Sequence, residues 1–138
     1  MTDTSRASER AVLEQGALDA IRALQSDAAP DLLARVIRLY LDSAPDLVGR
    51  IRTGLATNDQ EAVRIAAHTL KSSSANLGAT RLAELCRQLE LAARAGSIGP
   101  GLPDAHAPEL PAPDMQAIER EYQAVRTALE LELGETTA

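Results

Sequence analysis

His68 is the side chain in this sequence best suited to group-transfer chemistry. A neutral imidazole carries a lone pair that can attack phosphorus near pH 7, and the phosphorylated product carries about two negative charges. Arg64 lies one helical turn before His68 and Lys71 lies one turn after it, so both cations can reach the volume above the ring. The same spacing also fits an ordinary exposed histidine on a solvated helix, and spacing alone does not choose between the two interpretations.

The helix expected from Asn58 to Asn76 has two distinct faces when it is projected at about 100° per residue. The side opposite His68 is mostly apolar or small and carries Val63, Ala66, Leu70, Ser73, Ser74 and Leu77. The side of His68 carries Glu61, Arg64, Lys71, Ser72 and Ala75. We therefore expect an exposed imidazole near the middle of a helix, with small neighbours that let another protein approach the ring.

Residues 68–79 carry a specific motif, His-Thr-Leu-Lys-Ser-Ser-Ser-Ala-Asn-Leu-Gly-Ala. This string resembles the signature His-x-Leu-Lys-Gly-Ser-x-x-x-Leu-Gly of the histidine phosphotransfer (HPt) domains of multistep phosphorelays. The resemblance continues through Ala66-Ala67 and residues 81–90, and more weakly from Leu18 to the last helix, so it covers most of the chain. It implies that His68 is the phospho-acceptor, that Lys71 is its electrostatic helper, and that the fold is a four-helix bundle.

The same resemblance implies the partners, which are receiver domains of hybrid histidine kinases and of response regulators. Arg64, Ser72 and Ala75 are then expected to form the docking surface. The chain needs no cofactor of its own, because the receiver is expected to supply Mg²⁺. Two positions depart from the family pattern: Ser72 stands where Gly is usual, and Glu90 stands where some members have a Gln near the imidazole. Glu90 is a candidate supporting residue whose role the sequence leaves open, because a carboxylate there could either orient the imidazole or repel phosphate.

Helical periodicity recurs along most of the chain and predicts an all-α fold with no strands. A short helix is expected at about 16–25, followed by an apolar helix from Pro30 in which Pro45 either kinks one long helix or starts a second. Asn58 with Glu61 resembles a capping box, Gly78 is expected to stop the helix of His68, and Thr80 and Asp114 are expected to cap the two helices that follow. The prediction is an antiparallel four-helix bundle with an additional short N-terminal helix or helices.

The segment between Gly96 and Pro113 is predicted to be a long loop, because it holds five of the seven prolines and three of the eight glycines. The domain boundaries follow from this pattern: a flexible segment at 1–15, a bundle at 16–133 and a flexible tail at 134–138. His106 lies within this loop without clustered ligands, so no metal site is predicted.

Composition limits the class of protein further. The 138 residues carry a net charge of -6, which argues against a protein that coats nucleic acid or an anionic membrane. Cys86 is the only cysteine, and no apolar run is long enough for a membrane helix, so a cytoplasmic protein is expected. The initial Met and the lack of a flanking domain favour a free-standing module.

Two other functions are alternatives to phosphotransfer. A histidine kinase also presents a phospho-accepting histidine on a helix, but the 70 residues after His68 leave no space for an ATP-binding domain. A helical adaptor could bind a receiver or kinase over the same face without carrying phosphate. The presence of both His68 and Lys71 favours the phosphotransfer protein, which has no ATP-dependent kinase activity of its own.

Overall fold

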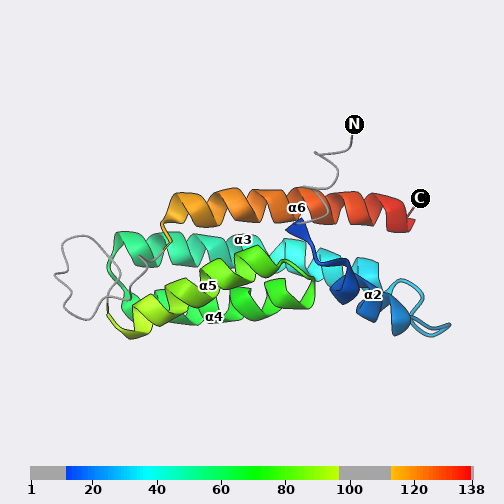
Figure 1. Ribbon diagram of the computed structural model, residues 1–138, viewed down its shortest axis with the longest axis horizontal. Coiled ribbons are helices and arrows are strands. Elements are labelled where there is room, and N and C mark those ends of the chain that lie inside the picture. The colour runs from blue at the N-terminus through cyan, green and yellow to red at the C-terminus, as the bar shows by residue number, and fades with distance from the viewer. Residues whose placement is uncertain (1–11, 97–112, 138) are drawn as a thin grey trace.

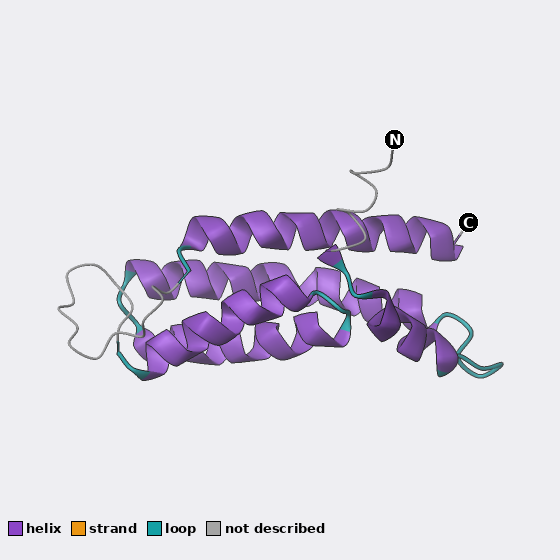
Figure 2. Ribbon diagram, in the orientation of Figure 1, coloured by secondary structure: helices purple, strands orange, loops and turns teal. Residues whose placement is uncertain are grey.

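The computed structural model describes residues 12–96 and 113–137, and the named elements in these ranges are all α-helices (Figure 2). They are α2 (Gln15–Ala23), α3 (Leu32–Ala56), α4 (Gln60–Asn76), α5 (Thr80–Arg94) and α6 (Met115–Thr137). The predicted all-α class is confirmed. No helix in the described ranges has the length and apolar character needed to cross a bilayer.

Helices α3 to α6 lie along the long dimension of the molecule and form the bundle (Figure 1). Each packs against two of the others, α3 against α4 and α6, and α5 against α4 and α6. Short turns at 57–59 and 77–79 make α3, α4 and α5 successively antiparallel. The largest side chains of the core are fully buried: Leu18, Leu33, Ile37, Ile51, Leu70, Leu77, Leu82, Leu89, Ile118 and Leu129.

One buried hydrogen bond joins α3 to the face of α4 that lies away from His68. The hydroxyl groups of Tyr40 and Ser74 are 2.9 Å apart, and the two residues are 4% and 0% exposed. A buried hydroxyl without a partner is unfavourable, so this pair disfavours other rotations of α4 against α3. The bond therefore helps to direct the opposite face of α4, which carries His68, to solvent.

Pro45 lies inside α3, so the first of the two alternatives is correct and the chain forms one continuous helix from Leu32 to Ala56. Proline removes one intrahelical hydrogen bond, but Pro45 is exposed, so water can reach the carbonyl left without its donor. Ala44, Val48 and Ile51 continue the buried stripe past the proline. Their packing stabilises the helix across the interruption.

Two predicted helix caps are wrong. Asp59, and not Asn58, is the N-cap of α4, and its carboxylate accepts a hydrogen bond from the Ala62 amide at 3.0 Å. Asn58 instead adopts a left-handed conformation with φ 58° in the turn before the helix. Thr80 is the first residue of α5 rather than its cap, since the N-cap position is Ala79 and no side-chain cap bond forms there.

Two other predicted helix boundaries are confirmed. Gly78 ends α4 with φ 80°, and the Ala79 amide bonds to the Ser74 carbonyl at 2.9 Å. This arrangement is a Schellman motif. Asp114 caps α6 by accepting from the Ala117 amide at 2.8 Å.

The ends of the domain differ from the prediction. Residues 12–15 pack against the bundle, since Leu13 is 2% exposed within the core and the Glu14 amide donates to the Gly78 carbonyl. At the other end, α6 continues to Thr137 through most of the predicted tail. Leu129 and Glu132 are both buried, and they anchor the last part of that helix. Most of the predicted loop at 96–113, together with His106, lies outside the described residues.

Candidate functional site

His68 lies near the middle of α4, and its side chain is 56% exposed. The predicted exposure is confirmed, because Val63, Ala66, Leu70, Ser74 and Leu77 are buried on the opposite side of the helix. Ser73 is the exception: it is half-buried at the edge of this face, and its hydroxyl donates to the Thr69 carbonyl at 3.0 Å. The core face therefore holds His68 toward solvent.

Glu90 of α5 holds the exposed residues of the site together through its buried carboxylate. Its side chain is only 4% exposed, and its two oxygens contact three residues. The Oε2 atom lies 2.9 Å from His68 Nδ1 and accepts from Arg94 Nη2 at 2.8 Å, while Oε1 accepts from Lys71 Nζ at 2.7 Å. One buried carboxylate thus joins the predicted acceptor and its predicted helper across the α4–α5 interface.

The pKa of Glu90 reflects two opposing effects. Burial by itself raises the pKa of the carboxyl, whereas the hydrogen bonds from Lys71 and His68 lower it. The bonds and the positive charges prevail, so the pKa of Glu90 is lowered from 4.5. Glu90 is therefore ionised at neutral pH and can only accept hydrogen bonds.

The ionised state of Glu90 determines which nitrogen of His68 carries the proton. A carboxylate has no proton to donate, so the 2.9 Å contact requires that Nδ1 be the donor. In the neutral ring, the lone pair then resides on Nε2, the nitrogen that makes no contact with Glu90. The site thus presents a side chain with a fixed tautomer and a free nucleophilic nitrogen.

Arg94 is a site residue that the sequence interpretation did not include. It lies one turn after Glu90 on α5, and its side chain is 56% exposed. Arg94 Nη2 and His68 Nδ1 contact the same oxygen, Glu90 Oε2, so the guanidinium lies beside the imidazole. The spacing of Glu90 and Arg94 predicts an ion pair within a helix, but only the packing of α5 on α4 places that pair next to His68.

The three predicted docking residues lie around His68 as expected, although they differ in exposure. Ser72 and Ala75 are exposed on the same side of α4 as the imidazole. Ser72 donates its hydroxyl hydrogen to the His68 carbonyl at 3.3 Å. Arg64 is half-buried and bonds to Glu61 through two nitrogens, at 2.9 and 2.6 Å.

Other reactive groups lie away from this site or are inaccessible. Cys86 is buried, as predicted, and burial raises the pKa of its thiol to about 12. Among the described residues, no group of three or more histidine, cysteine, aspartate or glutamate side chains is placed to hold a metal ion.

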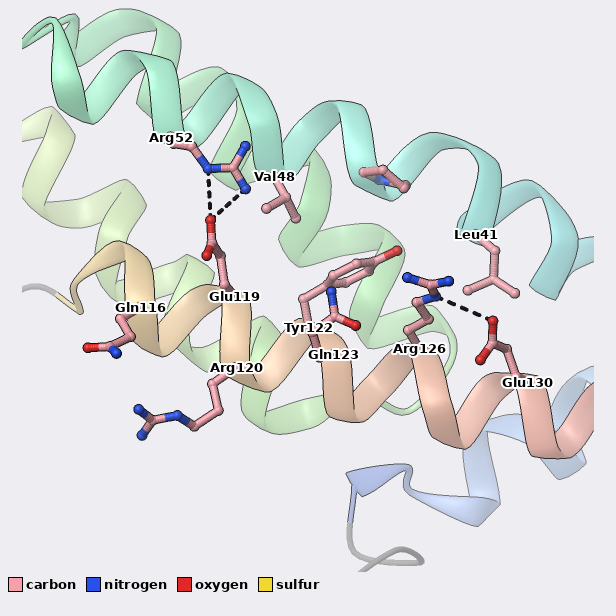
Figure 3. A pocket seen from close by; sticks show the side chains of 11 residues that line it. Leu41, Val48, Arg52, Gln116, Glu119, Arg120, Tyr122, Gln123, Arg126 and Glu130 are labelled. Carbon is pink, nitrogen blue, oxygen red and sulfur yellow. Dashed lines mark hydrogen bonds and ion pairs between the residues drawn. The ribbon is translucent and has the colours of Figure 1, made fainter.

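A groove of about 840 Å³ lies between α3 and α6, with Tyr122 between the two helices (Figure 3). Ion pairs between Arg52 and Glu119 and between Arg126 and Glu130 lie along it. Its lining residues all belong to α3 and α6, so it is separate from the face of His68.

Comparisons with known proteins agree with this arrangement. The family described as Hpt domain matches residues 35–128, which is more than half of the chain. The structure is similar to the crystal structure of histidine-containing phosphotransfer protein B (HptB) from Pseudomonas aeruginosa PAO1, with a TM-score of 0.71 and 25% sequence identity. The match covers 90% of this chain and 96% of that protein. No curated protein matches the sequence.

The lowered pKa of Glu90 predicts a specific dependence of stability on pH. Ionised Glu90 stabilises the native state above its ordinary pKa of 4.5, and this contribution is lost as pH falls through its lower native pKa. The free energy of unfolding of the wild type should therefore fall more steeply below about pH 5 than that of Glu90→Gln. Urea unfolding at a series of pH values measures both curves, and parallel curves would contradict this account of Glu90.

Proposed function

The chain belongs to the Hpt domain family, whose members are the histidine phosphotransfer proteins of phosphorelays, and we therefore propose that His68 is the phospho-acceptor of this chain. In this proposal His68 takes a phosphoryl group from the aspartate of one receiver domain and passes it to the aspartate of another. The observation that carries the assignment is the exposed imidazole whose Nδ1 is held by buried Glu90, while Nε2 makes no hydrogen bond to any residue that the structure describes.

The transfer is a displacement at phosphorus. The Nε2 lone pair forms the N–P bond as the P–O bond to the receiver aspartate breaks, and the electron pair of that bond remains on the departing carboxylate. The phosphorylated ring retains the proton on Nδ1 and becomes cationic. Glu90 lies 2.9 Å from Nδ1 and stabilises this charge, and the reverse steps return the phosphoryl group to a second receiver.

Glu90 is a carboxylate, but its position limits its repulsion of the phosphoryl group. It contacts the ring at Nδ1, whereas the phosphoryl group joins Nε2. Both of its oxygens are also bonded to cations, one to Lys71 and the other to Arg94. Two positive charges against one negative charge leave a net positive charge beside the ring, which favours the incoming phosphoryl oxygens.

The partner surface in this proposal is the exposed side of α4 together with the adjoining groove between α3 and α4. The groove has a volume of about 920 Å³, and Ile65 and Thr69 of α4 are among its lining residues. Ile65 is 50% exposed and lies one turn before His68. With Ser72 and Ala75, these residues form an uncharged surface of mostly small side chains beside the ring, which suits the close approach that direct transfer between two proteins requires.

Hpt proteins are phosphotransfer intermediates and not kinases, so we propose that this chain receives all of its phosphoryl groups from receivers. The receiver supplies the Mg²⁺ and the acidic pocket that binds it, while this chain contributes the nucleophile and two cations. A location in the reducing cytoplasm is part of the proposal, since the chain has a single cysteine and no possible internal disulfide.

Substitution of His68 tests the acceptor directly. His68→Gln should abolish labelling by a receiver charged with radiolabelled acetyl phosphate, while changing the free energy of unfolding by less than about 1 kcal/mol because the side chain is exposed. The matched control is His106→Gln, which replaces the only other histidine. In the wild type, the label should be acid-labile and base-stable. A variant that still accepts phosphate would exclude His68, and a wild type that binds the charged receiver without labelling would support the adaptor function.

The two cations bonded to Glu90 should act on the phosphorylated state. Lys71→Ala and Arg94→Ala should each slow phosphoryl transfer and shorten the lifetime of phosphohistidine by about two- to tenfold, since each removes one charge-assisted contact. Arg87→Ala is the control, because Arg87 lies on α5 but pairs with Glu84. Decay of the purified phosphoprotein measures the lifetime. If all three variants match the wild type both in the rate of transfer from a charged receiver and in phosphohistidine decay, Lys71 and Arg94 have no role in transfer.

Side-chain size at position 72 tests the docking surface. Ser72→Trp should retain normal helicity but weaken receiver affinity and slow transfer by about tenfold or more, because the indole obstructs the approach to His68. Ser72→Gly should transfer at least as fast as the wild type, with a slightly lower stability. Gln123→Trp on α6 is the control for an added surface tryptophan. Equal transfer rates for the two tryptophan variants would place the receiver elsewhere.

A further inference from the structure

Residues 12–23, here called the N-terminal strap, connect two parts of the bundle that are distant in sequence. The strap lies at the end of the molecule where the α4–α5 turn and the C-terminal part of α6 also lie (Figure 1). Leu13 and Leu18 hold it in the core, at 2% and 0% exposure. The Hpt match begins only at residue 35, so the strap precedes the matched region.

The first attachment of the strap is at the α4–α5 turn. The Glu14 amide donates to the Gly78 carbonyl at 2.7 Å, and the Glu14 carboxylate caps the start of α2. The backbones are so close that a Cβ atom at Gly78 would overlap the Glu14 carbonyl oxygen and lie 2.8 Å from its nitrogen. Gly78 thus has two roles, since it ends α4 with a positive φ and also admits the strap.

The second attachment is at Glu132 of α6, which is 9% exposed. Arg22 Nη2 donates to Glu132 Oε2 at 2.8 Å, and Gln15 Nε2 donates to Oε1 at 3.3 Å. A second nitrogen of Arg22 pairs with Asp19 within α2, also at 2.8 Å. A buried carboxylate that lost these partners would be strongly unfavourable, so the pairing holds α2 against α6.

The α4–α5 turn matters for the site because every contact of Glu90 with His68 and Lys71 crosses from α5 to α4. Gly78 is ten residues from His68, or about 15 Å along the helix, and movement of the turn changes the register of the two helices. A small displacement suffices to break a bond of 2.9 Å.

We propose that the N-terminal strap is a conformational coupling device, which fixes the α4–α5 turn against α6 and thereby maintains the register that joins His68 to Glu90. Release of the strap loosens the turn and breaks the bond between His68 Nδ1 and Glu90, so that the imidazole can adopt both neutral tautomers. Any effect on phosphotransfer rests on the proposed role of His68, whereas the effect on the turn and on the tautomer does not.

Charge reversal in the full-length chain tests the coupling. Glu132→Lys places a cation against Arg22 and should release the strap, whereas Glu130→Lys makes the same change at an exposed ion pair on the same helix. The Glu14 amide, which bonds to Gly78, reports attachment of the strap through its hydrogen-exchange rate. Nitrogen NMR of the His68 ring reports the tautomer, and radiolabel transfer from a charged receiver is measured separately.

In Glu132→Lys, exchange of the Glu14 amide should accelerate by roughly tenfold or more, and the His68 ring should lose its preference for the Nδ1–H form. Glu130→Lys should match the wild type, and Arg22→Glu combined with Glu132→Lys should restore both signals. Fast exchange with an unchanged His68 tautomer would overturn the coupling and leave the strap a purely structural element. An unchanged exchange rate would overturn the attachment at Glu132.

Gly78→Ala provides a second test that does not involve charge. Alanine at position 78 would be strained by the positive φ and would also overlap Glu14. Alanine at position 96, where φ is 71°, would be strained in the same way, but its Cβ would meet no atom within 4 Å. Gly78→Ala should therefore lose more stability and show the altered His68 tautomer, while Gly96→Ala should retain the wild-type tautomer. Unchanged tautomers in both variants would contradict the coupling. An altered tautomer in Gly78→Ala with an unchanged transfer rate would leave the coupling intact and count against the proposed role of His68 instead.

Discussion

The site depends on one physical constraint, which is that the buried carboxylate of Glu90 must be paired. An isolated charge at 4% exposure would be costly, and three bonded partners on two helices offset that cost. The requirement is mutual: the partners keep Glu90 ionised, and ionised Glu90 orients His68 and keeps two cations beside it. An exposed residue thus acquires a defined geometry from a buried one.

The bundle supports this arrangement from two sides of α4. On the core side, the bond between Tyr40 and Ser74 opposes rotation of α4 and so holds His68 outward. At the C-terminal end, the turn at Gly78 is closed by its own backbone bonds and by Glu14. The chemistry requires only a few side chains, but their precision depends on contacts at Ser74 and Gly78, six and ten residues along the chain from His68.

The two grooves of the surface differ in their relation to the candidate site. The groove between α3 and α4 borders the face of His68, whereas the groove between α3 and α6 shares no residue with α4 or α5. In the proposed docking mode, a receiver that covers the first groove leaves the second exposed. In a chain with a net charge of -6, Lys71 and Arg94 concentrate positive charge beside His68, and this charge favours phosphoryl oxygens at this face.

The sequence alone determined the helical periodicity, the exposed face of α4 and the motif around His68, because these depend on residues within a few turns of one another. It also indicated that Lys71 lies beside His68, since the two residues are three positions apart on the same helix. Helix starts were less predictable, because Asn58, Asp59 and Thr80 are all chemically able to cap and the choice depends on the path of the turn. The continuity of α3 through Pro45, the burial of Glu90, the place of Arg94 and the packing of residues 12–15 were decided only by tertiary structure. Each of these depends on which surfaces of separate helices meet, and residues 14 and 78, or 22 and 132, are brought together only when the whole bundle has formed.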